Sequence, residues 1–194
     1  MRYLLFVVAF AFYTNIASAQ LTKGNWLIGG NGKFYSSKED FKIPPSISSS
    51  SKRIDINISS NIGYFVTDRL AFGLKPAVSF VKSKTIHSNT SNDKNLTIQK
   101  YLLGPFGRYY FLDKKRQSNI LIDASYQFGT YSIYESRGKL RTFSIAAGPV
   151  IYFNSSVGIE FLVGYRYSFE AIDDAKRTNK GFQVGIGFQI HLKK

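Results

Sequence analysis

The 194-residue chain contains no cysteine and only one methionine and one tryptophan. The absence of cysteine excludes a disulfide framework, a thiol nucleophile, a thiolate metal site and a lipoprotein anchor. Acidic residues are also scarce, with 12 Asp and Glu against 26 Lys and Arg, so the formal net charge is +14. Such a charge can indicate a nucleic-acid partner. Here the basic residues are scattered, apart from the run at 114–116, and we expect no nucleic-acid binding.

Long apolar runs are missing everywhere except at the N-terminus. Arg2 precedes a continuous apolar stretch over 3–13, and a triplet of small residues ends at Ala19, just before Gln20. This pattern is typical of a secretory signal peptide, and we predict cleavage between Ala19 and Gln20. Asn15 interrupts the stretch well before the roughly 20 apolar residues that a membrane-spanning helix needs. Any later membrane span must therefore be made of strands.

Beyond the predicted signal peptide, apolar and polar side chains alternate. The segment 53–64 is the clearest, with mostly apolar side chains at its even positions and polar side chains at its odd positions. Such a period of two places the two rows on opposite faces of a strand. Seven other segments follow the same pattern: 25–35, 70–80, 101–111, 120–129, 141–153, 157–168 and 182–192. The sequence therefore predicts residues 1–19 as a signal peptide and 20–194 as one all-β domain. We expect an eight-stranded antiparallel up-and-down transmembrane barrel.

The predicted connections alternate in length. Short links are expected over 65–69, 112–118 and 154–156, and long polar loops over 36–51, 82–96 and 169–179. The link over 131–139 is shorter but belongs with the long ones by its order. Short turns at one end and long loops at the other are typical of outer-membrane barrels, with both termini in the periplasm.

Alternation also fits a soluble, lipocalin-like barrel whose apolar row lies inside. Three features favour a membrane barrel whose apolar rows face lipid over a soluble barrel. The large apolar side chains are too many for an eight-stranded interior, glycines fall mostly on the polar rows, and aromatic residues lie near strand ends. The central apolar rows also lack charge, and a lysine or arginine facing lipid at the midplane would cost about 2–4 kcal/mol. We therefore expect Ile56, Phe161 and Ile186 to face outward, and Arg108 and Glu160 to face inward.

Three prolines, Pro76, Pro105 and Pro149, fall inside the predicted strands. Each removes a donor from the hydrogen-bond ladder, and a closed barrel has no free edge to accommodate the loss. We expect bulges or donor-free positions at these three places.

Charged residues on the polar rows should point into the barrel, where buried charges need partners. We predict an interior ionic network that fills and stiffens the barrel. Its members are Arg53, Asp55, Arg108, Asp123, Glu160 and Arg166. A narrow ion path is the alternative, which the small bore disfavours.

Catalytic chemistry is not expected. His87 and Ser88 are adjacent, but a serine nucleophile and its base need an orienting carboxylate. His191 stands at the chain end, and the pair at 173–174 lacks the further spaced oxygen ligands of a calcium site. We predict no catalytic residue, no metal and no cofactor.

Several motifs carry a resemblance. The sequence KGNWLIGG over 23–30 opens the first strand, and GPFGRYYF over 104–111 is echoed by GPVIYF over 148–153. On these motifs, residues 20–194 resemble the small outer-membrane β-barrel domain proteins common in Bacteroidota, of the eight-stranded OmpA/OmpX-like or PorT-like type. The resemblance implies an outer-membrane location and a barrel fold. Membership of a secretion or gliding complex is only an open alternative.

The last predicted strand resembles the C-terminal signal that the barrel-assembly machinery recognises. The matching residues are Gln183, Gly185, Phe188 and Ile190, although the chain ends on two lysines instead of an aromatic residue. The resemblance implies this machinery as a partner during biogenesis.

We expect a non-enzymatic barrel with a structural or interaction role in the outer membrane of a Gram-negative bacterium. Expected partners are outer-membrane lipid and lipopolysaccharide, which loop lysines would attract by charge, and an unidentified envelope protein. Three alternatives stay open: a narrow solute or ion pore, an outer-membrane lipid-modifying enzyme, and a soluble lipocalin-like carrier.

Overall fold

The computed structural model describes residues 21–43, 47–87, 94–113, 116–133, 136–172 and 175–193. They form ten strands: β1 (Trp26–Ile43), β2 (Ile47–Thr67), β3 (Leu70–Leu74), β4 (Ala77–His87), β5 (Lys94–Leu103), β6 (Pro105–Tyr110), β7 (Ser118–Ile133), β8 (Ser136–Tyr152), β9 (Val157–Ile172) and β10 (Ala175–Leu192). Within these ranges no helix has the length and apolar character needed to cross a membrane.

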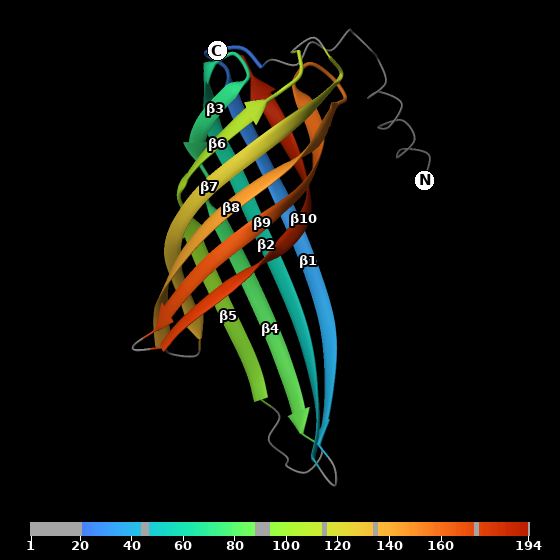
Figure 1. Cartoon of the computed structure of the whole chain (residues 1–194), viewed down its shortest axis with the longest axis vertical. Helices are drawn as coiled ribbons and strands as arrows, with labels where there is room; N and C mark the ends of the chain where they lie inside the picture. Colours follow the sequence, from blue (N-terminus) through green and yellow to red (C-terminus); the bar gives the residue numbers. More distant parts are fainter. Residues whose placement is uncertain are drawn as a thin grey trace, which may run out of the picture.

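The ten strands occupy eight positions in one closed antiparallel ring (Figure 1). The ring closes because β1 pairs with both β2 and β10. β3 and β4 both pair with β2, and β5 and β6 both pair with β7, so each of these couples is a single barrel position with an interruption. The predicted eight-stranded up-and-down topology is therefore confirmed.

The interruptions occur beside prolines. Lys75 and Pro76 separate β3 from β4, and Gly104 separates β5 from β6 next to Pro105. The two interruptions are neighbours, because the Lys75 amide donates a hydrogen bond to the Gly104 carbonyl at 2.8 Å. Strand pairing keeps the same register on both sides, so of the two expected alternatives, a bulge or a donor-free position, the bulge does not occur there. At Pro149 the pairing of β8 with β9 skips the proline and the residue before it, so this ladder is interrupted beside a proline as well.

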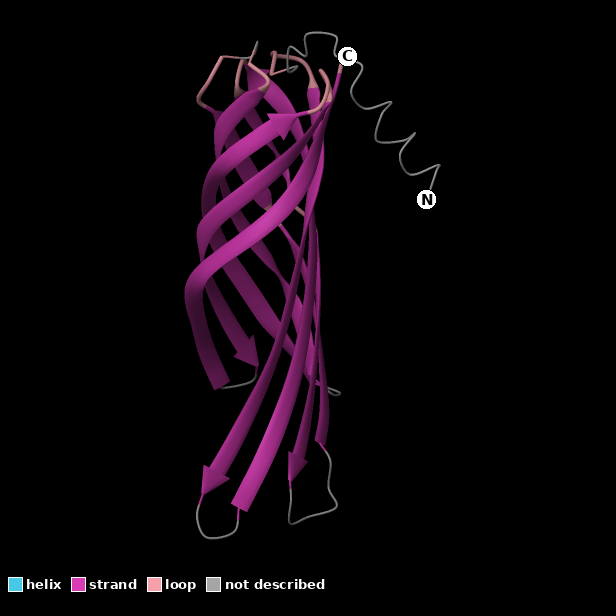
Figure 2. Ribbon diagram, turned by 90° about the vertical axis from the view of Figure 1, so that its right-hand side faces the viewer, coloured by secondary structure: helices cyan, strands magenta, loops and turns pink. Residues whose placement is uncertain are grey.

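The strands are longer than the sequence predicts. Three segments expected to be long loops, 36–51, 82–96 and 169–179, are largely paired strand in the structure. Polar composition shows that a segment meets water, but a polar hairpin satisfies its backbone groups in the ladder as well as a loop does in solvent. Figures 1 and 2 show that the β1–β2 and β4–β5 hairpins reach further than the hairpins of β7–β8 and β9–β10. The short links lie at the opposite end, together with the C-terminus.

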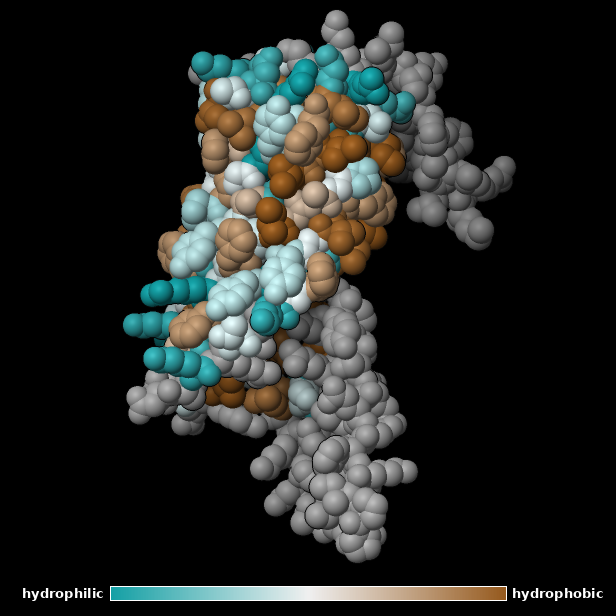
Figure 3. Space-filling view, viewed as in Figure 1, coloured by the Kyte–Doolittle hydropathy of each residue, from teal (hydrophilic) through white to brown (hydrophobic). Residues whose placement is uncertain are grey.

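The two rows of each strand face the predicted sides. Ile56, Phe161 and Ile186 are 41%, 44% and 57% exposed on the outer wall. Arg108 and Glu160 are 1% and 0% exposed in the interior. Figure 3 shows the result on one face, where hydrophobic side chains spread over the wall and hydrophilic ones gather along the end that carries the short links.

Candidate functional site

The barrel interior near the short-link end is filled by an aromatic plug. The His191 ring packs against three others, with ring centroids 5.4 Å from Phe65, 6.0 Å from Tyr110 and 5.6 Å from Tyr152. These four side chains are completely buried. Leu21, which precedes β1, is buried in the same cluster. These four residues point inward because each is adjacent in its strand to an outward-facing residue, and successive side chains of a strand point to opposite faces.

An ionic layer lies next to this plug, with Arg108 of β6 at its centre. Its guanidinium donates two hydrogen bonds to Glu160 of β9, at 2.6 and 3.3 Å, and one to Asp123 of β7 at 3.1 Å. Such a fork suits two carboxylates because the guanidinium presents several donors in one plane. The Lys75 ammonium pairs with the second oxygen of Asp123. Two cations thus face two carboxylates, and the layer is neutral as a unit.

Gln189 of β10 joins the ionic layer to the aromatic plug. Its amide oxygen accepts hydrogen bonds from Arg108, at 3.2 Å, and from the Tyr110 hydroxyl. Its amide nitrogen donates to the Tyr152 hydroxyl at 3.4 Å. The phenol groups of the plug are therefore hydrogen-bonded, as buried hydroxyls must be to avoid a desolvation cost.

The glycines of the inner rows make room for these side chains. A Cβ atom built on Gly187 would lie 2.7 Å from the Gly30 carbonyl oxygen and 2.9 Å from a carboxylate oxygen of Glu160. A side chain at this position would therefore displace the carboxylate that Arg108 binds. The same test at Gly32, which lies on the exposed outer row, finds nothing within 4 Å.

A polar cavity of about 40 Å³ opens on the other side of the ionic layer. Lys75 and Asp123 form one part of its wall, and Arg166, Gln183 and Ser144 form another. A cavity needs roughly 10–15 Å³ to hold one water molecule, so this space suits a small cluster of water. It is too small for a metabolite.

A second ion pair lies further along the interior. The Lys100 ammonium of β5 binds Glu170 of β9, and it also stands 5.9 Å from the centre of the Tyr131 ring. Thr142 and Ser168 share a hydrogen bond of 3.0 Å between neighbouring strands. The interior is therefore cross-linked by polar contacts at two levels.

The predicted network and the observed one overlap in part. The structure brings together Arg108, Asp123 and Glu160, and Arg166 lines the cavity whose wall also includes Asp123. Arg53 and Asp55 belong to β2, but their side chains lie outside the described part of the structure.

Sequence reasoning missed four members of the interior: Lys100, Tyr110, Tyr152 and Glu170. Lys75 and Gln189 belong to the polar rows that were expected to face inward, but their partners were not predicted. Strand parity could have found the tyrosines. Tyr110 directly follows the outward Tyr109, and Tyr152 directly follows the outward Ile151.

Two other predictions concern the rest of the chain. The assembly-signal residues lie in β10 with the expected alternation, since Gln183 and Gly185 line the cavity while Phe188 is 51% exposed and Ile190 shares its side. The predicted signal peptide, with Ala19 and Gln20, lies outside the described residues.

The described residues show no cluster of metal-ligating side chains. In the ranges given above, no three His, Cys, Asp or Glu side chains gather as metal ligands would. His191 is enclosed by rings, and neither ring nitrogen has a hydrogen-bond partner. The side chain of His87, Ser88 and the pair at 173–174 lie outside the described part.

The geometry defines a closed antiparallel barrel with an apolar outside and an ionic, filled inside. No family model matches the sequence, and no curated protein matches it. Among solved structures, the chain is similar to the crystal structure of Neisserial surface protein A (NspA), with 19% identity over 87% of this chain and 97% of that chain and a TM-score of 0.49. It is also similar to the N-terminal β-barrel domain of Pseudomonas aeruginosa OprF, with 13% identity over 88% and 98% of the two chains and a TM-score of 0.41.

Proposed function

We propose that the chain is an integral barrel protein of a Gram-negative outer membrane, with a structural or interaction role and no enzymatic activity. One observation carries the proposal: large apolar side chains stand exposed on the outside of every barrel position, while ionic side chains are buried inside. Soluble monomers rarely expose a contiguous apolar patch larger than a few hundred Å². A belt of apolar side chains around the whole barrel is much larger than such a patch. Lipid acyl chains would cover such a belt without cost.

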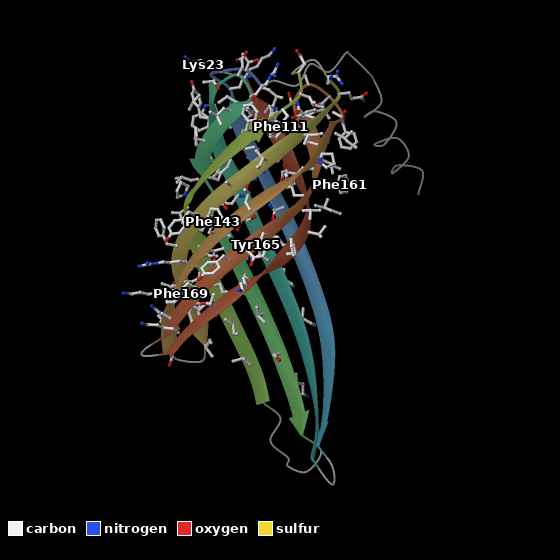
Figure 4. All side chains as sticks on the ribbon, in the orientation of Figure 1. Lys23, Phe111, Phe143, Phe161, Tyr165 and Phe169 are labelled. Atoms are coloured by element: carbon white, nitrogen blue, oxygen red, sulfur yellow. The ribbon has the colours of Figure 1, made fainter. Side chains whose placement is uncertain are left out.

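The ends of the belt support this placement. Trp26 and Tyr64 pack edge to face at 5.5 Å near the short-link end, and Tyr165 and Phe182 do so at 5.5 Å towards the other end. Both couples project from the outer wall, where membrane proteins place aromatic girdles. Lys23 marks the polar rim beyond the first girdle in Figure 4.

The filled interior argues for a closed barrel. The aromatic plug and the ionic layer together occupy the bore from β1 to β10, and eight strands leave little space beyond their own side chains. We therefore propose that the barrel does not conduct solutes, and that its role lies on its surfaces.

Export and assembly belong to the same proposal. Residues 1–19 would direct secretion and be removed, and the pattern ending β10 would be read by the barrel-assembly machinery. The motifs over 23–30 and 104–111 support placing the chain with the Bacteroidota type of small barrel domain.

Two measurements test the proposal. A folded barrel extracted in detergent should migrate differently on a gel before and after boiling, and the protein reconstituted into planar bilayers should show no stable conductance. Release from cells without detergent would refute the membrane location. Steady single-channel currents would refute the closed interior.

A further inference from the structure

The far rim of the outer wall carries a cluster of cations. On β8, Arg137, Lys139 and Arg141 are all exposed at alternate positions, so they share the outward face. On β10, Lys176 and Lys180 are exposed on the same face. We call these five side chains the rim cations.

Strand register places them around β9. Lys139 and Lys176 both lie opposite Ala171, one on each side of it, and Lys180 lies opposite Tyr167. Neighbouring strands are about 4.8 Å apart, so the cations of β8 and β10 lie about 10 Å from one another across the wall. Along β10 the two lysines are about 13 Å apart.

The cluster borders an aromatic groove. A hollow of about 310 Å³ on the outer wall is lined by Tyr126, Arg141, Phe143, Tyr167 and Phe169. Arg141 lies opposite Phe169 in the neighbouring strand, so one wall of the groove is cationic and the rest is aromatic. Figure 4 shows Phe143 and Phe169 on this wall with nitrogen-tipped side chains projecting beside Phe169, and Figure 3 shows hydrophilic side chains extending from the same area.

Described acidic side chains do not balance this charge. Within the described parts of β7 to β10 the acidic residues are Asp123, Glu160 and Glu170, and all three are buried inside the barrel. Within the described residues, the outer face of this wall is therefore cationic at its rim and aromatic, then aliphatic, along the belt. An occupant that fits both must carry several negative charges next to acyl chains.

We propose that the rim cations and the adjoining groove bind the phosphate groups of an anionic glycolipid in the outer leaflet, with its acyl chains lying along the apolar belt. The inference rests on the proposed membrane placement. The cations span two strands and several residue rows, a footprint wider than one phosphate. A headgroup with more than one phosphate therefore fits better than a phospholipid with one.

The test uses the full mature chain folded in a neutral detergent, with bound lipid measured by native mass spectrometry. The probes are bisphosphorylated lipid A, the same glycolipid with its phosphates removed, and phosphatidylglycerol. The variant is Arg141→Gln with Lys176→Gln and Lys180→Gln. The matched control removes three exposed cations at the opposite end, by Lys23→Gln, Arg116→Gln and Lys193→Gln.

We expect the wild type to prefer bisphosphorylated lipid A over both other lipids. The rim variant should bind it more weakly by on the order of tenfold or more, because each cation near a charged lipid surface contributes to attraction, while the control variant binds as the wild type does. Equal affinity for the phosphorylated and dephosphorylated glycolipids would overturn the proposal. So would equal binding of phosphatidylglycerol, or equal losses in both variants.

A gel-shift on boiling, measured on all three proteins, separates this failure from failure of the proposed function. If the gel shift is present and the lipid preference is absent, the barrel proposal is supported and the lipid-site proposal is refuted. If the wild type shows no gel shift and does not insert into bilayers, the proposed membrane barrel and the proposed lipid site are both refuted.

Discussion

Replacing Arg108 with methionine tests the ionic layer most sharply. The arginine is 1% exposed, and it donates both of the hydrogen bonds that Glu160 accepts in the structure. Asp123 keeps Lys75 as a partner, but Glu160 would stay buried and lose the one cation that it pairs with among the described residues. Breaking a buried ion pair from one side costs about 3–5 kcal/mol, because the remaining charge stays desolvated. We expect Arg108→Met to lower the free energy of unfolding by that amount.

A second substitution separates lost charge balance from lost packing. Adding Glu160→Gln to Arg108→Met removes the unpaired charge, so the double variant should recover at least about half of the loss. Unfolding can be followed in urea with lipid vesicles through the fluorescence of Trp26, the single tryptophan of the chain. Arg116→Met, at an exposed position in a short link, serves as the control and should be neutral. Additive losses in the double variant would refute the reasoning.

Three further substitutions have distinct expected outcomes. Phe161→Lys places a charge on the belt, at a height between Phe111 and Phe143 in Figure 4, and should cost about 2–4 kcal/mol of unfolding free energy in lipid vesicles. A neutral result would contradict a lipid-facing wall. Gly187→Ala should destabilise by about 1–3 kcal/mol through overpacking, whereas Gly32→Ala should change the urea midpoint little, since nothing lies within 4 Å of its added atom. Tyr110→Phe removes the hydroxyl that donates to Gln189 and should cost about 0.5–1.5 kcal/mol, measured by the same titration.

The topology and the side assignment could be predicted from the sequence because both follow from a period of two. Alternation assigns each residue to a face, and the excess of large apolar side chains over interior space decides which face is outside. Strand length could not be predicted in the same way. Apolar residues become scarce at 36–51 and 82–96, and the sequence therefore predicts that the strands end there. In the structure this change marks the edge of the apolar belt, while the hydrogen-bonded strand pairing continues beyond it.

The interior contacts were only partly predictable for a related reason. Parity shows that Arg108, Asp123 and Glu160 point inward, but the partner of each depends on the tilt and stagger of strands distant in sequence. Lys75 reaches Asp123 across 48 positions, and Gln189 reaches Tyr110 across 79. These distances in the chain become contacts only when the ring closes, and no local pattern encodes them.

The predicted loop at 169–179 shows how the same limit affects the rim cations. Lys176 and Lys180 look like solvated loop charges in the sequence, yet β10 starts at Ala175 and places them on a strand wall beside β9. Their position next to Tyr167 and Ala171 depends on pairing that polar composition does not reveal.

The accessibility of single labelled positions tests directly which row of each strand faces lipid and which faces the barrel interior. The chain has no cysteine, so single cysteines at Ile56, Phe161 and Ile186 can each carry one fluorophore in lipid vesicles. Cysteines at Ser125 and Ser144 would line a cavity of about 40 Å³, which has no room for a fluorophore. We predict that labels at the three apolar positions are quenched by brominated acyl chains and protected from iodide, and that cysteines at the two serines resist labelling until the barrel is unfolded. Ready labelling at Ser125 and Ser144 in the folded barrel, with the apolar positions open to iodide, would contradict the account.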